Sequence, residues 1–227
     1  MIKAILLDVD NTLLDFDKSA TEVIKKLFSK MGLTYTDNVF RTFIRINDGL
    51  WKKIEKAEIT REQLHNIRWD TVFSELGITA DGKRAEKLFL DGLHSVAIPV
   101  DGAKEILGYL SAKYALYTAS NAPYAQQVNR LTISGLYPFI TGIMNFEKDG
   151  VHKPQREFFE RCMNTLSPLK REEIALIGDS ISADVKGGKE MGFTTVWFNA
   201  KGVTADEQTR KICDGIITSL SEIKEIF

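Results

Sequence analysis

This chain of 227 residues lacks several features that would place it in a specialised class of protein. It has only two cysteines, Cys162 and Cys213, and their separation fits neither a metal-binding spacing nor a disulfide framework, so we expect two reduced side chains. Its 30 basic and 31 acidic residues almost balance, which gives no sign of a nucleic-acid-binding surface. No apolar run approaches the ~20 residues of a membrane span, and no signal core follows the first residues. We therefore expect a cytoplasmic protein whose partner is neither a nucleic acid polymer nor a membrane.

The rest of the composition is that of an ordinary globular protein. Hydrophobic residues make up 44% of the chain and charged residues 27%, which suits one large or two small domains. The apolar pattern changes character twice. Residues 1–14 predict a strand and a loop, residues 18–95 have helical spacing throughout, and residues 98–227 alternate between helices and strands.

These patterns predict two domains from one interrupted sequence. Alternating helices and strands favour a parallel sheet with helices on both faces, so residues 1–14 and 98–227 should form a three-layer, Rossmann-like α/β core. Residues 15–97 should form an all-helical domain, inserted after the first strand and placed over its carboxyl end. In that domain a capping box between Thr60 and Gln63 should begin the third helix, and Gly77 should end it.

Two carboxylates mark the end of the first strand. Asp8 and Asp10 follow a short apolar run, and alternate residues of a strand point the same way. Open α/β sheets bind ligands at the carboxyl ends of their strands. Two acids this close repel each other unless a cation or a shared proton relieves them. The pair predicts a divalent metal, two separated pKa values, or both, with an ordinary acidic turn as the alternative.

Three later segments carry residues suited to the same edge of the sheet. Strand 114–118 should end at Thr118, where a hydroxyl and the backbone amides that follow suit an anion such as phosphate, although such residues also cap helices. Lys153 precedes a helix and can offset phosphate charge, although most lysines are solvated. Strand 173–178 should end at Asp179, placed for a cation that prefers oxygen, and Asp184 follows in the next helical turn.

The order of these residues closely resembles the four motifs of the haloacid dehalogenase-like (HAD) superfamily. Those motifs are an Asp-x-Asp-x-Thr strand end, a Ser/Thr strand end, a lysine and an acidic Gly-Asp loop, and the resemblance covers nearly the whole chain. The inserted helices are similar to the helical, C1-type cap of the superfamily. The resemblance implies a phosphatase that uses Mg²⁺ and hydrolyses small-molecule phosphate monoesters through an aspartyl-phosphate.

The same resemblance implies a role for each motif residue. Asp8 would attack phosphorus, and Asp10 would protonate the leaving oxygen and later accept a proton from water. An acid at Asp10 favours phosphatases over the metal-independent dehalogenases. Thr118 would hold the phosphoryl group and Lys153 would offset its charge. The metal ligands would be Asp8, Asp179 and the backbone carbonyl of Asp10, with Asp184 and Ser180 in support, and the further phosphate- or substrate-binding residues would be Thr12, Ala119 and Asn121.

A narrower resemblance concerns the substrate. The stretch 46–51 in the insertion and 197–199 in the core resemble the house-cleaning pyrimidine nucleotidases of the superfamily, which hydrolyse nucleoside 5′-monophosphates. Candidate specificity residues in the cap are Phe16, Asp48, Trp51 and Arg68. Trp51 can stack on a base, although a tryptophan at helical spacing is more often part of a core.

Other functions remain open at this point. A sugar-phosphate phosphatase or a phosphoglucomutase-like enzyme would share every core motif and differ only in the cap. A regulatory module with a phosphorylatable aspartate belongs to another class, and the complete set of motifs argues against it. For the oligomeric state we expect a monomer or a weak homodimer.

Overall fold

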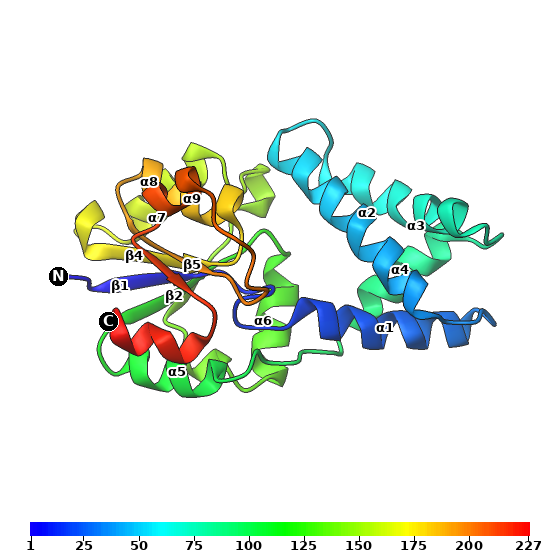
Figure 1. The fold of residues 1–227 in the computed structure, drawn as a ribbon, viewed down its shortest axis with the longest axis horizontal. Helices are drawn as coiled ribbons and strands as arrows, with labels where there is room; N and C mark the ends of the chain where they lie inside the picture. Colours follow the sequence, from blue (N-terminus) through cyan, green and yellow to red (C-terminus); the bar gives the residue numbers. More distant parts are fainter. The chain divides into compact units, whose positions relative to one another are not determined.

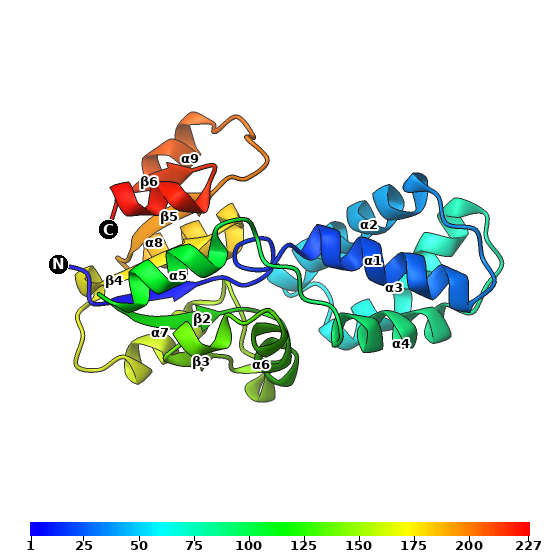
Figure 2. The same ribbon diagram turned by 90° about the horizontal axis from the view of Figure 1, so that it is seen from below.

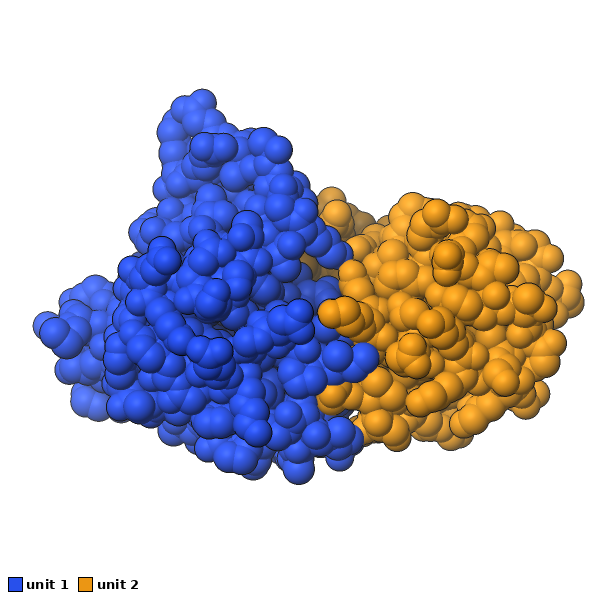
Figure 3. All heavy atoms as spheres, turned by 60° about the horizontal axis from the view of Figure 1, so that its bottom comes forward, with its two compact units in different colours: residues 1–15, 98–227 blue, residues 16–97 orange.

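A computed structural model describes all 227 residues, which divide into two compact units, coloured separately in Figure 3. The first unit is Met1–Asp15 with Ile98–Phe227, and the second is Phe16–Ala97. None of the helices in the chain has the length and apolar character that a membrane crossing demands.

The first unit is built on a six-stranded, wholly parallel sheet in the order β3-β2-β1-β4-β5-β6. Parallel sheets bury both faces, which explains why all four residues of β1 are apolar and inaccessible. The predicted α/β fold with a parallel sheet is confirmed. The strands are β1 (Ala4–Leu7), β2 (Ala115–Ala119), β3 (Gly142–Met144), β4 (Ile174–Gly178), β5 (Thr194–Phe198) and β6 (Gly215–Ile217).

Helices cover both faces of this sheet. Figures 1 and 2 show α7 and α8 on one face and α5 with the C-terminal η5 on the other. On the first face, Phe158 and Phe159 of α7 pack with Leu6 of β1 and Leu176 of β4. The helices of this unit are α5 (Ala103–Ser111), α6 (Tyr124–Ile133), α7 (Arg156–Thr165), α8 (Gly187–Glu190), α9 (Glu207–Ile212) and the 3-10 turns η1 (Tyr137–Phe139), η2 (Glu147–Asp149), η3 (Arg171–Glu173) and η5 (Leu220–Glu225).

One helix of the core differs from the prediction. The pattern of residues 182–191 predicts one continuous helix, but the structure divides it into η4 (Ile181–Lys186), which has π-helical hydrogen bonds, and the short α8. Single π-helical turns are rare in proteins, and those that exist often lie at functional sites. This turn carries Asp184, which it brings back to the end of β4.

The second unit consists of four helices: α1 (Phe16–Lys30), α2 (Asp37–Glu55), α3 (Arg61–Leu76) and α4 (Gly82–Leu93). Its core centres on Trp69, whose ring lies 5.2 Å from Phe43, 5.5 Å from Phe73 and 5.8 Å from Phe89. The predicted capping box at Thr60 is present, and Gly77 ends α3 in the left-handed conformation, with φ of 65°. Local capping signals therefore define this helix at both ends.

Candidate active site

The first strand delivers Asp8 and Asp10 on a tight loop. The amide of Asp8 donates to the Ile177 carbonyl at 2.9 Å, so Asp8 still lies against the end of β4. Beyond it the amides of Leu13 and Leu14 both donate to the Val9 carbonyl, at 2.9 and 2.8 Å. Asn11 takes a left-handed φ of 60°, which asparagine tolerates better than most residues. The turn therefore holds both acids at the carboxyl edge of the sheet.

Lys153 is the cation of this site. Its ammonium group donates to Asp8 Oδ1 at 2.7 Å and to Asp184 Oδ1 at 2.6 Å, and the side chain is 2% exposed. Asn121 holds the backbone of Lys153 from both sides, because its Oδ1 accepts from the Lys153 amide at 2.8 Å and its Nδ2 donates to the Lys153 carbonyl at 2.9 Å. Asn121 therefore fixes the backbone of Lys153, whereas the resemblance implied a contact with phosphate or substrate.

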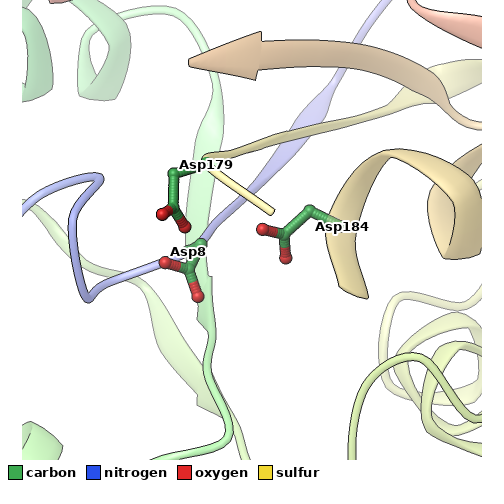
Figure 4. A group of neighbouring side chains, drawn as sticks. All are labelled: Asp8, Asp179 and Asp184. Carbon is green, nitrogen blue, oxygen red and sulfur yellow. The ribbon is translucent and has the colours of Figure 1, made fainter. Parts of the chain in front are cut away.

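Three carboxylates converge beside the lysine (Figure 4). Asp8 follows β1, Asp179 follows β4 and Asp184 comes from η4, and one oxygen of each lies within 4.8 Å of the others. The Asp184 carboxylate also accepts from the Ser180 amide at 3.0 Å. A side chain at Gly178 would overlap the Asp184 carboxylate, so glycine is required there for the two segments to approach.

Burial and mutual repulsion raise the pKa values of two of these acids, Asp8 and Asp179. Burial raises the pKa of Asp8 to about 7, although the charge of Lys153 opposes the shift. The pKa of Asp179 is raised as well, first by burial and then by the charges of Asp8 and Asp184. For Lys153, burial favours a lower pKa, but the carboxylates of Asp184 and Asp8 outweigh it and raise the pKa. The lysine is thus a permanent cation, whereas Asp8 and Asp179 resist ionisation.

This donor set fits a divalent metal ion. Magnesium and calcium prefer oxygen ligands, and the three converging side chains offer carboxylate oxygens alone. A bound cation would relieve the burial and repulsion that raise the pKa values of Asp8 and Asp179. Asp184 was expected only to support the metal ligands, but its carboxylate belongs to the cluster and can be a ligand itself. The carboxylate of Asp10 lies outside the cluster and pairs with Arg130 instead.

Thr118 does not stand where the sequence suggested. β2 continues to Ala119, and Thr118 pairs in register with Leu7, the residue before Asp8. Because neighbours in a strand face opposite sides, Thr118 points to the face of the sheet away from Asp8. Its hydroxyl is fully buried and donates to Gln127 Oε1 at 3.3 Å. The first hydroxyl beyond the strand end belongs to Ser120, whose Oγ accepts from the Ala122 amide at 3.1 Å.

Two other residues expected at the phosphate are also enclosed. Thr12 and Ala119 are completely buried, and the Thr12 hydroxyl has no hydrogen-bond partner. Ser180, expected to support the metal, caps η4 by accepting from the Ala183 amide at 3.0 Å while its own amide holds Asp184. These side chains therefore shape the loops of the site.

Two important residues of α6 were not predicted. Arg130 donates to Asp10 Oδ1 at 2.6 Å, and the amide group of Gln127 donates to the Ala122 carbonyl at 2.8 Å. Both are 1% exposed. In sequence, polar residues three positions apart on a helix look like a solvated face, so nothing in the pattern alone marks these two as buried.

The expected specificity residues lie on the helical unit in different settings. Phe16 and Trp51 pack, partly buried, against its hydrophobic core, and Asp48 is exposed. Arg68 is 3% exposed, with its guanidinium on both oxygens of Glu86 at 2.6 and 3.1 Å. Within the helical unit Arg68 is therefore a buried, ion-paired residue.

Comparisons with known proteins agree with this geometry. The family model of haloacid dehalogenase-like hydrolases matches residues 2–192. The putative HAD-hydrolase YfnB of Bacillus subtilis is 32% identical over 197 residues, covering 87% of this chain and 84% of YfnB. A crystal structure of YfnB bound to magnesium superposes with a TM-score of 0.92 over 99% of this chain and 98% of that one.

Two further relatives have assigned substrates. The pyrimidine 5′-nucleotidase PynA of Streptococcus pneumoniae is 31% identical over 198 residues, covering 87% of this chain and 84% of PynA. A glyceraldehyde 3-phosphate phosphatase of Methanocaldococcus jannaschii is 26% identical over 235 residues, covering 100% of this chain and 97% of the enzyme.

Proposed function

Since the chain belongs to the haloacid dehalogenase-like hydrolases, we propose that it is a Mg²⁺-dependent phosphatase acting on nucleoside 5′-monophosphates of the pyrimidine class. The observation that carries the proposal is the position of Asp8. One of its oxygens accepts from Lys153 at 2.7 Å, and its carboxylate belongs to a largely buried acidic cluster suited to a divalent cation. A nucleophile, a permanent cation and a metal site thus meet at one strand end.

In the first step the Asp8 carboxylate attacks phosphorus. An oxygen–phosphorus bond forms, the ester bond breaks, and the leaving oxygen takes a proton from Asp10. Lys153 offsets charge on the phosphoryl oxygens, and the Ser120 hydroxyl with the amides after β2 orients them. The product on the enzyme is an aspartyl-phosphate at Asp8.

In the second step water attacks the phosphorus of that aspartyl-phosphate and passes a proton to Asp10. Inorganic phosphate leaves, and the Asp8 carboxylate is restored. The residues that would hold Mg²⁺ are Asp8, Asp179 and Asp184, with the backbone carbonyl of Asp10 as a further ligand. When bound, the metal supplies charge neutralisation for the phosphoryl group.

The substrate class rests on the helical unit and on the nucleotidase relative. We propose that residues 15–97 act as a cap that selects substrate for the core formed by residues 1–14 and 98–227, and that cap closure excludes water. PynA is a pyrimidine 5′-nucleotidase, and its similarity extends over the insertion as well as the core.

The test is a phosphate-release screen with Mg²⁺ over nucleoside monophosphates, sugar phosphates and a chromogenic phosphate ester. We expect turnover of pyrimidine nucleoside monophosphates by the natural protein and none by Asp8→Asn, which keeps the size of the side chain. Folding of the variant is checked by circular dichroism. Equal activity of Asp8→Asn would remove the nucleophile assignment, and no turnover on any ester would refute the phosphatase.

A sugar-phosphate phosphatase is the second candidate. The glyceraldehyde 3-phosphate phosphatase relative matches this chain from end to end, including the helical insertion. A preference for sugar phosphates in the same screen would favour it. A mutase would isomerise a sugar phosphate without releasing phosphate, so product analysis separates the two reactions.

A further inference from the structure

Helix α6 places a buried arginine against the second acid of the site. Arg130 is 1% exposed, and its Nη1 donates to Asp10 Oδ1 at 2.6 Å, whereas the Asp10 side chain remains 30% exposed. The two residues lie 120 positions apart in the sequence. The contact therefore joins α6 to the loop that follows β1.

The setting of Arg130 is unusual for a structural residue. A guanidinium carries five N–H donors, and here Nε and Nη2 are buried without any hydrogen-bond partner. Buried donors without partners destabilise a fold, and well-packed apolar residues often replace buried ion pairs at no loss of stability. An apolar residue would therefore fill this position at least as well. The presence of arginine calls for an explanation in the chemistry of Asp10.

We infer that Arg130 is the positioning residue for Asp10, fixing the carboxylate through Oδ1 so that Oδ2 is directed to proton transfer. The inference rests on the proposed function, since it concerns the acid and base of that reaction. Fixing one oxygen removes rotation of the carboxylate about its last bond, and the orientation of a catalytic group affects rate strongly. Arg130 itself touches no reacting atom.

A second contact of α6 explains how the arginine is held in place. Gln127, one helical turn earlier, donates to the Ala122 carbonyl at 2.8 Å in the loop after β2. One helix therefore connects the loop of the acid with the loop proposed to orient phosphate. Helix α6 therefore fixes both Arg130 and the loop after β2, whose amides are proposed to orient phosphate.

The inference predicts a dependence on the leaving group. An alkoxide, such as the 5′-oxygen of a nucleoside, needs a proton from Asp10 as it departs, whereas p-nitrophenolate departs without one. The value of kcat/KM covers the steps up to that departure, so it isolates the proton donation. For Arg130→Gln we expect kcat/KM to fall roughly 100-fold on a nucleoside monophosphate and less than about fivefold on p-nitrophenyl phosphate.

The experiment compares both substrates across a small set of variants. Arg130→Lys, which keeps the cation, should recover much of the loss on the nucleotide. In an Asp10→Asn background, Arg130→Gln should change kcat/KM on the nucleotide by less than about twofold, because the residue acts only through Asp10. Arg156→Gln, an exposed arginine paired with Glu160, is the matched control and should match the natural protein. Thermal melts identify any variant that fails to fold.

The outcomes separate this inference from the proposed function. If the natural protein hydrolyses no phosphate ester, the proposed function is wrong. Two results with an active natural protein would overturn the inference and leave Arg130 a structural role alone. One is an equal fall in kcat/KM on both substrates in Arg130→Gln. The other is a fall well beyond about twofold on the nucleotide when Arg130→Gln is added to Asp10→Asn. Should Arg130→Gln fail to fold, the same comparison is made with Arg130→Met, which fills the buried position without a cation; a selective loss on the nucleotide supports the inference, and an equal loss on both substrates or no loss refutes it.

Discussion

Lys153 Nζ lies 2.7 Å from Asp8 Oδ1, although 145 positions separate the two residues in the sequence. The contact joins the loop before α7 to the end of β1, and both side chains are buried. A buried carboxylate beside a fixed cation is half of an electrostatic site for a phosphate ester. The carboxylates of Asp179 and Asp184 beside Asp8 add negative charge, which favours the binding of a divalent metal ion.

Removing the lysine should therefore affect stability and activity together. The Lys153→Met substitution roughly keeps the volume of the side chain but leaves Asp8 and Asp184 buried without their cation. Breaking a buried pair from one side costs about 3 kcal/mol or more in free energy of unfolding. Losing one preorganised cation should lower kcat on phosphate esters about 100-fold or more.

Urea unfolding and steady-state kinetics test this variant. Lys189→Met is its control, because Lys189 pairs with Asp214 at 2.7 Å but is 38% exposed, so its loss should change the free energy of unfolding by less than about 1 kcal/mol. Comparable effects of the two substitutions would contradict the assigned importance of burial.

The stability of the metal-free protein should fall as pH rises. Burial raises the pKa of Asp8 from its ordinary value of 3.8 to about 7. Between these values the folded protein holds a proton that the unfolded chain has lost, so its contribution to the free energy of unfolding is complete below pH 3.8 and disappears as pH rises to about 7. Urea titrations at several pH values in the presence of a chelator measure the slope.

Asp8→Asn supplies the comparison, since an amide does not titrate and its profile should be flatter. Saturating Mg²⁺ should also flatten the profile of the natural protein, because a bound cation favours the ionised carboxylate. A profile that is unaffected by either change would show that another group controls the pH dependence.

The acidic cluster should bind Mg²⁺ through Asp184 as well as Asp179. Both Asp179→Asn and Asp184→Asn remove one carboxylate oxygen from the set, and we expect each to weaken Mg²⁺ binding at least about tenfold. Calorimetric titration of the metal-free protein measures it. Asp214→Asn, which alters an acid 38% exposed and outside the cluster, should bind Mg²⁺ like the natural protein.

Ser120, and not Thr118, should be the hydroxyl that matters for turnover. Ser120→Ala removes a donor at the end of β2 and should lower kcat on phosphate esters by roughly 10- to 100-fold. Thr118→Val keeps the shape of a side chain that faces the opposite side of the sheet, so kcat should change less than about threefold. Kinetics on one substrate decide between them, and a larger loss in Thr118→Val would reverse the assignment.

The difference between these two hydroxyls shows where inference from the sequence succeeds and where it stops. The acids at Asp8 and Asp179 follow from apolar runs that end in charged residues, because parallel strands bring their carboxyl ends to one edge. Lys153 follows from its place just before a helix and from the order of the motifs. The expectation for Thr118 was wrong because β2 ends one residue later than the sequence suggested, at Ala119, so that Ser120 and not Thr118 follows the strand end. Arg130 could not be found at all, since its burial depends on α6 packing against a loop far away in sequence.

Arg68 shows the same limit in the helical unit and leads to a last prediction. Its guanidinium binds both oxygens of Glu86, donates to Asn47 Oδ1 at 2.8 Å and lies 4.7 Å from the ring of Phe89. Burial lowers the pKa of Arg68, although Glu86 opposes the shift, which makes the arginine dependent on that one carboxylate. Glu86→Gln should therefore lower the free energy of unfolding by about 3 kcal/mol.

Replacing both partners should be far less harmful than replacing one. The double variant Arg68→Met, Glu86→Leu leaves no buried charge, and we expect it to regain most of the stability lost in Glu86→Gln, as other buried pairs do when both members become apolar. Urea unfolding of Arg68→Met, of Glu86→Leu and of the double variant gives the coupling free energy directly. Additive losses would mean that the pair is not coupled, and that Arg68 contributes chiefly through its packing on Phe89.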